Sequence, residues 1–247
     1  MTTVDQPTLK RRDILSPRLR IRHLIGWTVG SALTGAWLQG AASLSKQQRP
    51  PGVVTYFDSP LALVSSGVTV VTTGGMIFLT ACAIYWSMRG IKGLWSPGVW
   101  LSVLGAVEFM RVVISFAIYA SGASREGLLL TGWLLQLVLT AGFCGIAMGR
   151  RLSWNWRLAF AFLAAGRLIE AVFATQFYLS QGERWLPYWV PLWFATFPTH
   201  GVGPLVVVGS AILIDCFRRR KWAWPHWIGA ALWLSELAIH EAMNRLT

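Results

Sequence analysis

The sequence predicts an all-α polytopic membrane protein: a bundle of about seven transmembrane helices with a cytoplasmic N-terminus and an external C-terminus. Of its 247 residues, 54% are hydrophobic and only 13% are charged, a balance typical of a membrane-embedded chain rather than a soluble domain. Seven apolar runs are separated by polar connections. The basic residues gather in alternate connections, which is the pattern that orients a multi-pass protein in a membrane.

The chain divides into a tail and one helical domain. Residues 1–22 are polar and basic, contain Pro17 and show no apolar periodicity, which predicts a cytoplasmic tail. Residues 23–247 are predicted to form a single transmembrane domain. The first apolar run, 24–44, has basic residues before it and small residues near its end, so a cleavable signal peptide is an alternative. The length of the run favours an uncleaved anchor.

Six further apolar runs follow the first one. They cover 61–88, 97–119, 128–148, 154–179, 202–217 and 224–243. All except 202–217 approach or exceed the roughly 20 residues that a helix needs to cross the hydrocarbon layer. Each is predicted to be helical, because lipid offers no water to unpaired backbone groups. The odd number of spans depends on the 202–217 run, which is short and contains Gly203 and Pro204.

The connections carry a clear charge asymmetry. Those after the second, fourth and sixth runs hold Arg89, Lys92, Arg150, Arg151, Arg157, Arg218, Arg219, Arg220 and Lys221. The opposite side holds Lys46, Arg49, Arg125, Arg184 and Arg245. Together with the basic tail, this predicts the stated orientation, in what we expect to be the bacterial cytoplasmic membrane. The net charge of +12 therefore reflects topology, so we expect the lipid bilayer as a partner and no nucleic acid.

Two charged pairs interrupt the third and fifth runs. Glu108 and Arg111 lie three residues apart, and Arg167 and Glu170 repeat this spacing in reversed order. On two helices that cross in the same direction, Glu108 would lie level with Arg167 and Arg111 with Glu170, so the charges would cancel. An unpaired charge at the bilayer centre costs about 2.5 kcal/mol or more. We therefore expect all four near the midplane, either as a structural clamp or as part of a binding site. Gln136 and Thr140 of the fourth run are further polar residues that could add hydrogen bonds within the bundle.

A second group of polar residues lies in the last run. Glu236, His240 and Asn244 recur at four-residue spacing, so they share one helix face in the outer half. His200 lies on the same outer side, ahead of the 202–217 run. Ionisable residues inside a membrane usually mark function, and imidazole titrates near neutral pH. The sequence thus predicts an outer-half site that binds or translocates a small polar or anionic solute and suits proton coupling.

Short pieces of the chain also resemble a family of membrane-embedded enzymes. The HxxxN spacing of His240–Asn244, the Phe197–His200 segment and the upstream Glu108–Arg111 pair resemble the CAAX-type intramembrane proteases, whose Glu and His residues activate water. The resemblance implies a membrane-embedded hydrolase. The chain departs from the family in having no double Glu, ExxR in place of a longer spacing, and FxxH in place of FxxxH.

Two other classes of function are also open. His226 and His240 lie fourteen residues apart on one run, with His23 on the inner side and His200 on the outer side, so two bis-His haem sites are conceivable. A structural or accessory subunit, forming a homo-oligomer or joining partner membrane subunits, is the alternative from a non-enzymatic class. Enzyme, transporter and subunit thus stay open, and the sequence assigns no cofactor.

Glycines at four-residue spacing predict close helix contacts. Gly26 and Gly30 lie in the first run, and Gly145 and Gly149 lie at the end of the fourth. Small residues at this spacing let two helix backbones approach each other. We expect such approaches within the bundle or between two copies of the chain.

Overall fold

A computed structural model describes residues 20–47, 60–90, 95–121, 125–149, 152–179, 202–218 and 222–246. Within these ranges the protein is all-helical. Its seven helices are α1 (Ile21–Gln47), α2 (Pro60–Met88), α3 (Pro97–Ala120), α4 (Arg125–Ala147), α5 (Trp154–Leu179), α7 (Val202–Phe217) and α8 (Trp224–Leu246). The predicted apolar runs coincide closely with these helices, so the prediction of an all-α chain is confirmed.

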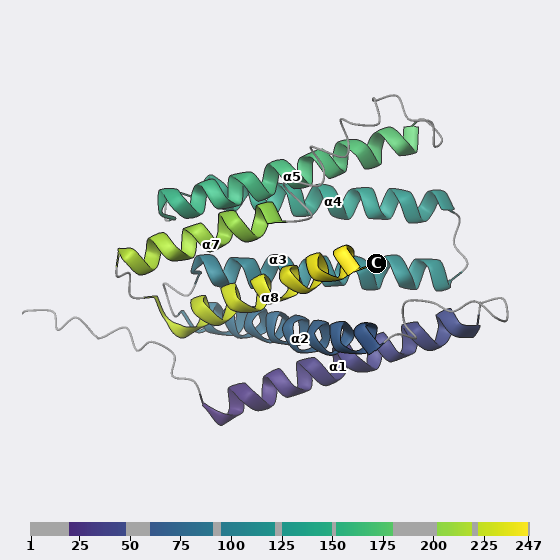
Figure 1. Cartoon of the computed structure of the whole chain (residues 1–247), viewed down its shortest axis with the longest axis horizontal. Coiled ribbons are helices and arrows are strands. Elements are labelled where there is room, and N and C mark those ends of the chain that lie inside the picture. The colour runs from purple at the N-terminus through teal and green to yellow at the C-terminus, as the bar shows by residue number, and fades with distance from the viewer. Residues whose placement is uncertain are drawn as a thin grey trace, which may run out of the picture.

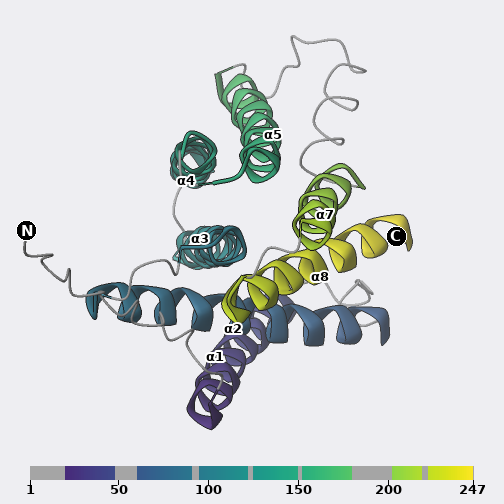
Figure 2. The ribbon, with the colours of Figure 1, turned by 90° about the vertical axis from the view of Figure 1, so that its left-hand side faces the viewer.

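Consecutive helices run in opposite directions (Figure 1). Helices α1, α3, α5 and α8 therefore begin at one end of the bundle, which we call the near end, and finish at the opposite, far end. Figure 2 looks onto the near end, where α3 and α4 are seen nearly end-on while α2 runs across the view. Because of this steep crossing, α2 packs against α1, α3 and α8.

Within the described ranges, three helices are long and apolar enough to cross a membrane. Their qualifying segments are Val64–Met88 in α2, Pro97–Ile118 in α3 and Leu130–Ala147 in α4. Helix α7 is apolar but has only 16 residues. At 1.5 Å per residue it covers about 24 Å, which is short of the roughly 30 Å hydrocarbon layer. The helices are thus compatible with a membrane bundle, in which α7 is the shortest member described.

Several helix ends follow from local sequence. Helices α2 and α3 begin at Pro60 and Pro97, where the missing N–H would have had no partner in any case. Helix α2 is followed by Gly90, whose φ of 72° is a left-handed conformation that glycine adopts without strain. The last turn of α4 is capped from α5, since Arg157 Nε donates to the carbonyl oxygen of Ala147 at 3.2 Å.

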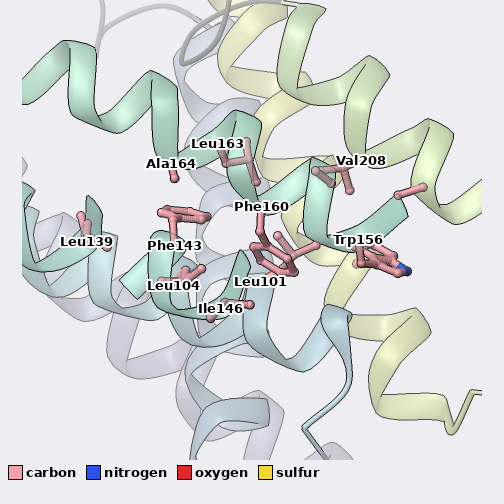
Figure 3. Packing of buried hydrophobic residues seen from close by; sticks show 13 residues of the cluster. Leu101, Leu104, Leu139, Phe143, Ile146, Trp156, Phe160, Leu163, Ala164 and Val208 are labelled. Atoms are coloured by element: carbon pink, nitrogen blue, oxygen red, sulfur yellow. The ribbon is translucent and has the colours of Figure 1, made fainter. Parts of the chain in front are cut away.

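The main apolar core lies between α3, α4, α5, α7 and α8, mostly in the half of the bundle toward the near end (Figure 3). Phe160 of α5 is fully buried there, with its ring centroid 6.3 Å from Phe143 and 6.2 Å from Trp156. A smaller cluster joins Met76 and Leu79 of α2 to Leu232 of α8. Glu108 and Arg111 of α3 and Arg167 and Glu170 of α5 lie beyond the main core, toward the far end.

Glycines set the closest helix contacts. A Cβ atom on Gly30 would lie 2.7 Å from the carbonyl oxygen of Gly74, so α1 and α2 meet where the Gly26/Gly30 pattern predicted. A Cβ atom on Gly229 would collide with the backbone of Gly98, where α8 meets α3. Gly145, by contrast, has nothing in the described part of the chain within 4 Å. The Gly145/Gly149 pattern therefore makes no close approach at Gly145 within the described chain.

Candidate functional site

The polar residues in the bundle form three separate centres. The quartet centre comprises Glu108, Arg111, Gln136, Arg167 and Glu170. The Glu236 centre comprises Thr72, Glu236 and His240. The Asp215 centre, at the near end, comprises Asn155, Trp156, Asp215, Trp222 and His226. The predicted binding residues that the structure describes thus divide between the first two centres.

The quartet centre links α3, α4 and α5 through a chain of ion pairs. Arg111 Nη2 lies 2.5 Å from Glu108 Oε1, and Arg167 Nη1 lies 2.9 Å from Glu170 Oε2. Arg167 Nη1 is also 3.8 Å from Glu108 Oε2, so the reversed order of the two motifs does bring α3 and α5 into register. Gln136 Nε2 of α4 donates to Glu170 Oε2 at 2.6 Å. Two acids and two bases thus neutralise one another.

The Glu236 centre joins α8 to α2. Glu236 lies twelve residues after Trp224, about 18 Å along α8, and its side chain is 18% exposed. The buried Thr72 hydroxyl hydrogen-bonds to Glu236 Oε2. His240 Nδ1 lies 3.1 Å from the main-chain oxygen of Glu236 and 3.6 Å from its Oε1. Among the residues that the structure describes, His240 is the only basic group at ion-pair distance from Glu236.

Local packing explains why Thr72 faces Glu236. Gly75 lies three residues after Thr72 on α2, and Leu232 lies four residues before Glu236 on α8, so each pair shares a helix face. A Cβ atom on Gly75 would lie 2.7 Å from Leu232 Cδ1. The absence of a side chain at Gly75 therefore admits Leu232. One turn farther along, the Thr72 hydroxyl comes within hydrogen-bonding reach of the Glu236 carboxyl group.

The Asp215 centre fastens α7 to α5 and to the start of α8. The fully buried Asp215 carboxylate accepts hydrogen bonds from the indole N–H groups of Trp156 at 2.6 Å and Trp222 at 2.7 Å. It also accepts one from Asn155 Nδ2 at 3.1 Å. Asn155 in turn donates to the carbonyl oxygen of Ala211 at 3.0 Å. These bonds account for a buried acid in an apolar helix, because buried charges need hydrogen-bond partners.

The two near-end histidines act as hydrogen-bond acceptors. His226 Nδ1 accepts the backbone N–H of Gly98 at 3.0 Å, and its ring stacks on Trp222. His23 Nδ1 accepts the backbone N–H of Arg20 at 2.9 Å. In the neutral form, each ring therefore carries its hydrogen on Nε2. A metal-bound imidazole offers a lone pair instead, so this arrangement does not favour a haem between His23 and His226.

The side chains of the two remaining predicted residues, His200 and Asn244, are not described. His200 is not among the described residues, and Asn244 lies on α8 but its side chain is not described.

The residues that resemble those of CAAX-type proteases have separate partners. Glu108 is paired with Arg111 and Arg167, whereas His240 contacts Glu236. The residues that carry the resemblance to CAAX-type proteases thus fall into different centres wherever the structure describes them.

Several residues of these centres, Thr72 and Asp215 among them, were not identified from the sequence as site residues. Thr72 is one of several threonines in α2, and nothing in their spacing distinguishes it from Thr69 or Thr73. Asp215 did carry a signal, because it is the only acid in the 202–217 run. Its partners Trp156 and Trp222 could not be identified, since they come from other segments.

Searches against protein families, curated proteins and solved structures found no match to this chain. The function is therefore argued from the three centres themselves. The quartet and Asp215 centres hold their charged groups in bonds within the protein. The Glu236 centre differs, because its acid is 18% exposed and is held by one hydroxyl group and an exposed imidazole, whereas Asp215 is fully buried and accepts hydrogen bonds from three side chains.

Proposed function

We propose that this chain is an integral membrane protein that binds or translocates a small polar or anionic solute at the Glu236 centre. About seven helices cross what we take to be the bacterial cytoplasmic membrane, with the near end in the cytoplasm and the far end outside. Among the described residues, the near end carries Arg20, Arg22, Arg89, Arg157 and Arg218, and the far end Lys46, Arg125 and Arg245. The excess of arginine at the near end supports this orientation.

The observation that carries the proposal is the environment of Glu236. Its described partners are the Thr72 hydroxyl and the His240 imidazole, neither of which is a fixed cation. Glu108 and Glu170, by contrast, each have an arginine partner. An acid that lacks a fixed counter-ion within a membrane is costly and is usually kept for function. A proton or a polar ligand would complete the Glu236 centre.

The position of His240 supports access from the far end. It lies sixteen residues after Trp224, about 24 Å along α8, and its side chain is 64% exposed. Glu236, one turn deeper, is 18% exposed. A solute arriving from outside would therefore meet the imidazole first and the carboxyl group second.

A thermal-shift comparison of purified wild type and Glu236→Gln tests the proposal. Between about pH 5 and 8, we expect the wild-type midpoint to depend on pH and the mutant, which has no carboxyl group at this position, to lose that dependence. A solute that binds the centre should raise the midpoint of the wild type alone. Glu241→Gln, the same change five residues farther along α8, is the control and should behave as wild type. Coincident wild-type and Glu236→Gln curves would contradict the proposal.

An accessory subunit of a larger membrane complex is the second candidate. The observation that favours it is the quartet centre, whose four charges neutralise one another without a ligand. This candidate predicts stable association with partner membrane subunits or with further copies of the chain. Native mass spectrometry of the tagged chain, extracted in mild detergent, would show a defined complex if this alternative holds.

A further inference from the structure

We infer that the coupling ion at the Glu236 centre is the proton, which reaches Glu236 through the His240 imidazole while the Thr72 hydroxyl stabilises both protonation states of the carboxyl group. The inference rests on the proposed function and names the ion that the same site would exchange. It assigns a role to each of the three side chains. Thr72 enters the site only through the packing of α2 against α8.

The hydrogen bonding of His240 identifies which ring nitrogen is free. His240 Nδ1 lies 3.1 Å from the main-chain oxygen of Glu236. A carbonyl oxygen can only accept a hydrogen bond, so Nδ1 must carry the hydrogen. In the neutral ring, Nε2 then holds a lone pair. Because the side chain is 64% exposed, Nε2 can take a proton from the far end. This is the opposite arrangement to that of the buried His226 ring.

The transfer itself is balanced within the pair. A proton binds to His240 Nε2 and forms the imidazolium ion. The Nδ1–H bond then breaks as a bond forms to Glu236 Oε1, leaving a neutral imidazole and a neutral carboxylic acid. The two atoms are 3.6 Å apart, so a side-chain rotation must bring them to about 2.6–3.2 Å. The reverse step returns the proton when the far end becomes alkaline.

The Thr72 hydroxyl suits both states of the carboxyl group. Its oxygen lies 2.9 Å from the carbonyl oxygen of Val68 and also hydrogen-bonds to Glu236 Oε2, but it has only one hydrogen to donate. When Glu236 is ionised, Thr72 donates this hydrogen to the carboxylate. When Glu236 is protonated at Oε1, its Oε2 becomes the carbonyl oxygen of the acid and still accepts this hydrogen from Thr72. Each state is therefore hydrogen-bonded inside the bundle.

The charged groups on the neighbouring helices have other partners. Helix α8 packs against α2, α3 and α7. Helix α2 carries no Asp, Glu, Lys, Arg or His. Glu108 and Arg111 of α3 pair with each other, and Asp215 of α7 bonds to tryptophans at the near end. Of α8's other titratable groups, His226 lies near Asp215, and Glu241 is the residue after His240. In the described chain, therefore, only His240 is placed to exchange a proton directly with Glu236.

Infrared difference spectroscopy of the full chain in lipid nanodiscs tests the inference. Lowering the pH should produce a carboxylic-acid C=O band in the wild type that is absent from Glu236→Gln. Thr72→Val, which keeps the shape but removes the hydroxyl, should move this band to higher frequency, whereas Thr72→Ser should leave it in place. His240→Ala should slow the appearance of the band after a pH jump by at least about tenfold, because it removes the acid–base group.

The outcomes separate this inference from the proposed function. If wild type and Glu236→Gln give the same bands across the pH range, Glu236 takes up no proton and the inference is wrong, even where a solute still stabilises the wild type alone. If the Glu236 band is present and responds to Thr72→Val and His240→Ala as stated, the inference holds. If the thermal-shift screen then found no solute that stabilises the wild type, that result would contradict the proposed solute binding and leave the proton inference standing.

Discussion

At the scale of single residues, the described histidines differ in the direction of one hydrogen bond. His23 and His226 use Nδ1 to accept a backbone N–H, whereas His240 uses Nδ1 to donate to a backbone oxygen. The first two rings are buried among aromatic side chains, and the third is exposed. We therefore assign the near-end pair to structure and His240 to proton exchange.

A substitution at His226 tests its structural role. Gly98 is the second residue of α3, so its N–H has no partner within that helix, and His226 supplies one from α8. His226→Ala should lower the free energy of unfolding by at least about 1–3 kcal/mol, because a buried donor loses its acceptor. His226→Asn, which keeps an accepting atom near the Nδ1 position, should cost less. Thermal unfolding in detergent measures both, and equal losses would contradict the assigned role.

At the scale of elements, a close backbone contact between two helices depends on the residue that the second helix presents as much as on the glycine spacing of the first. The Gly26/Gly30 spacing predicted a close approach on that face of α1 without naming its partner, and Gly30 meets Gly74 of α2 there. The contact of α3 with α8 was missed, because neither Gly98 nor Gly229 has a second glycine four residues away on its own helix. Gly145 fits a motif but has no close neighbour in the described chain. A spacing describes one helix face, whereas a close approach needs two.

Alanine substitutions distinguish these glycines. Gly229→Ala places a methyl group against the backbone of Gly98, so we expect a loss of about 1–3 kcal/mol as the helices are forced apart. Gly145→Ala meets open space and should be neutral or stabilise the helix by up to about 1 kcal/mol. Unfolding in mixed micelles would compare the two variants. Equal stability would mean that α3 and α8 do not touch at Gly98.

At the scale of the whole molecule, the quartet centre ties α3, α4 and α5 together through charge balance. Glu108→Gln leaves two arginines against one acid, and an unbalanced charge in hydrocarbon costs at least about 2.5 kcal/mol. We expect this variant to be clearly destabilised. The double variant Glu108→Gln/Arg111→Gln restores neutrality and should recover much of the loss in a thermal-unfolding assay. A double variant as unstable as the single one would refute the clamp.

The sequence predicted the helices well, because the length and apolarity of a segment are local properties, and a long apolar segment in lipid must form a helix to pair its backbone groups. The 202–217 run and α7 have the same limits, and the reversed order of Glu108–Arg111 and Arg167–Glu170 predicted the register of α3 and α5. The sites were predicted in part. The Glu236–His240 pair follows from four-residue spacing, but its contact with Thr72 depends on how steeply α2 crosses α8, which no local pattern encodes.

Membrane orientation is a property of the whole chain, and single cysteines can test it. With Cys82, Cys144 and Cys216 replaced by serine, Ser121→Cys reports on the far end and Arg89→Cys on the near end, since both residues are exposed just beyond their helices. We expect a membrane-impermeant thiol reagent to label Ser121→Cys in intact cells. It should label Arg89→Cys only after permeabilisation, because arginines concentrate on the cytoplasmic side. The reverse pattern would place His240 on the cytoplasmic side, and protons would then reach Glu236 from within the cell.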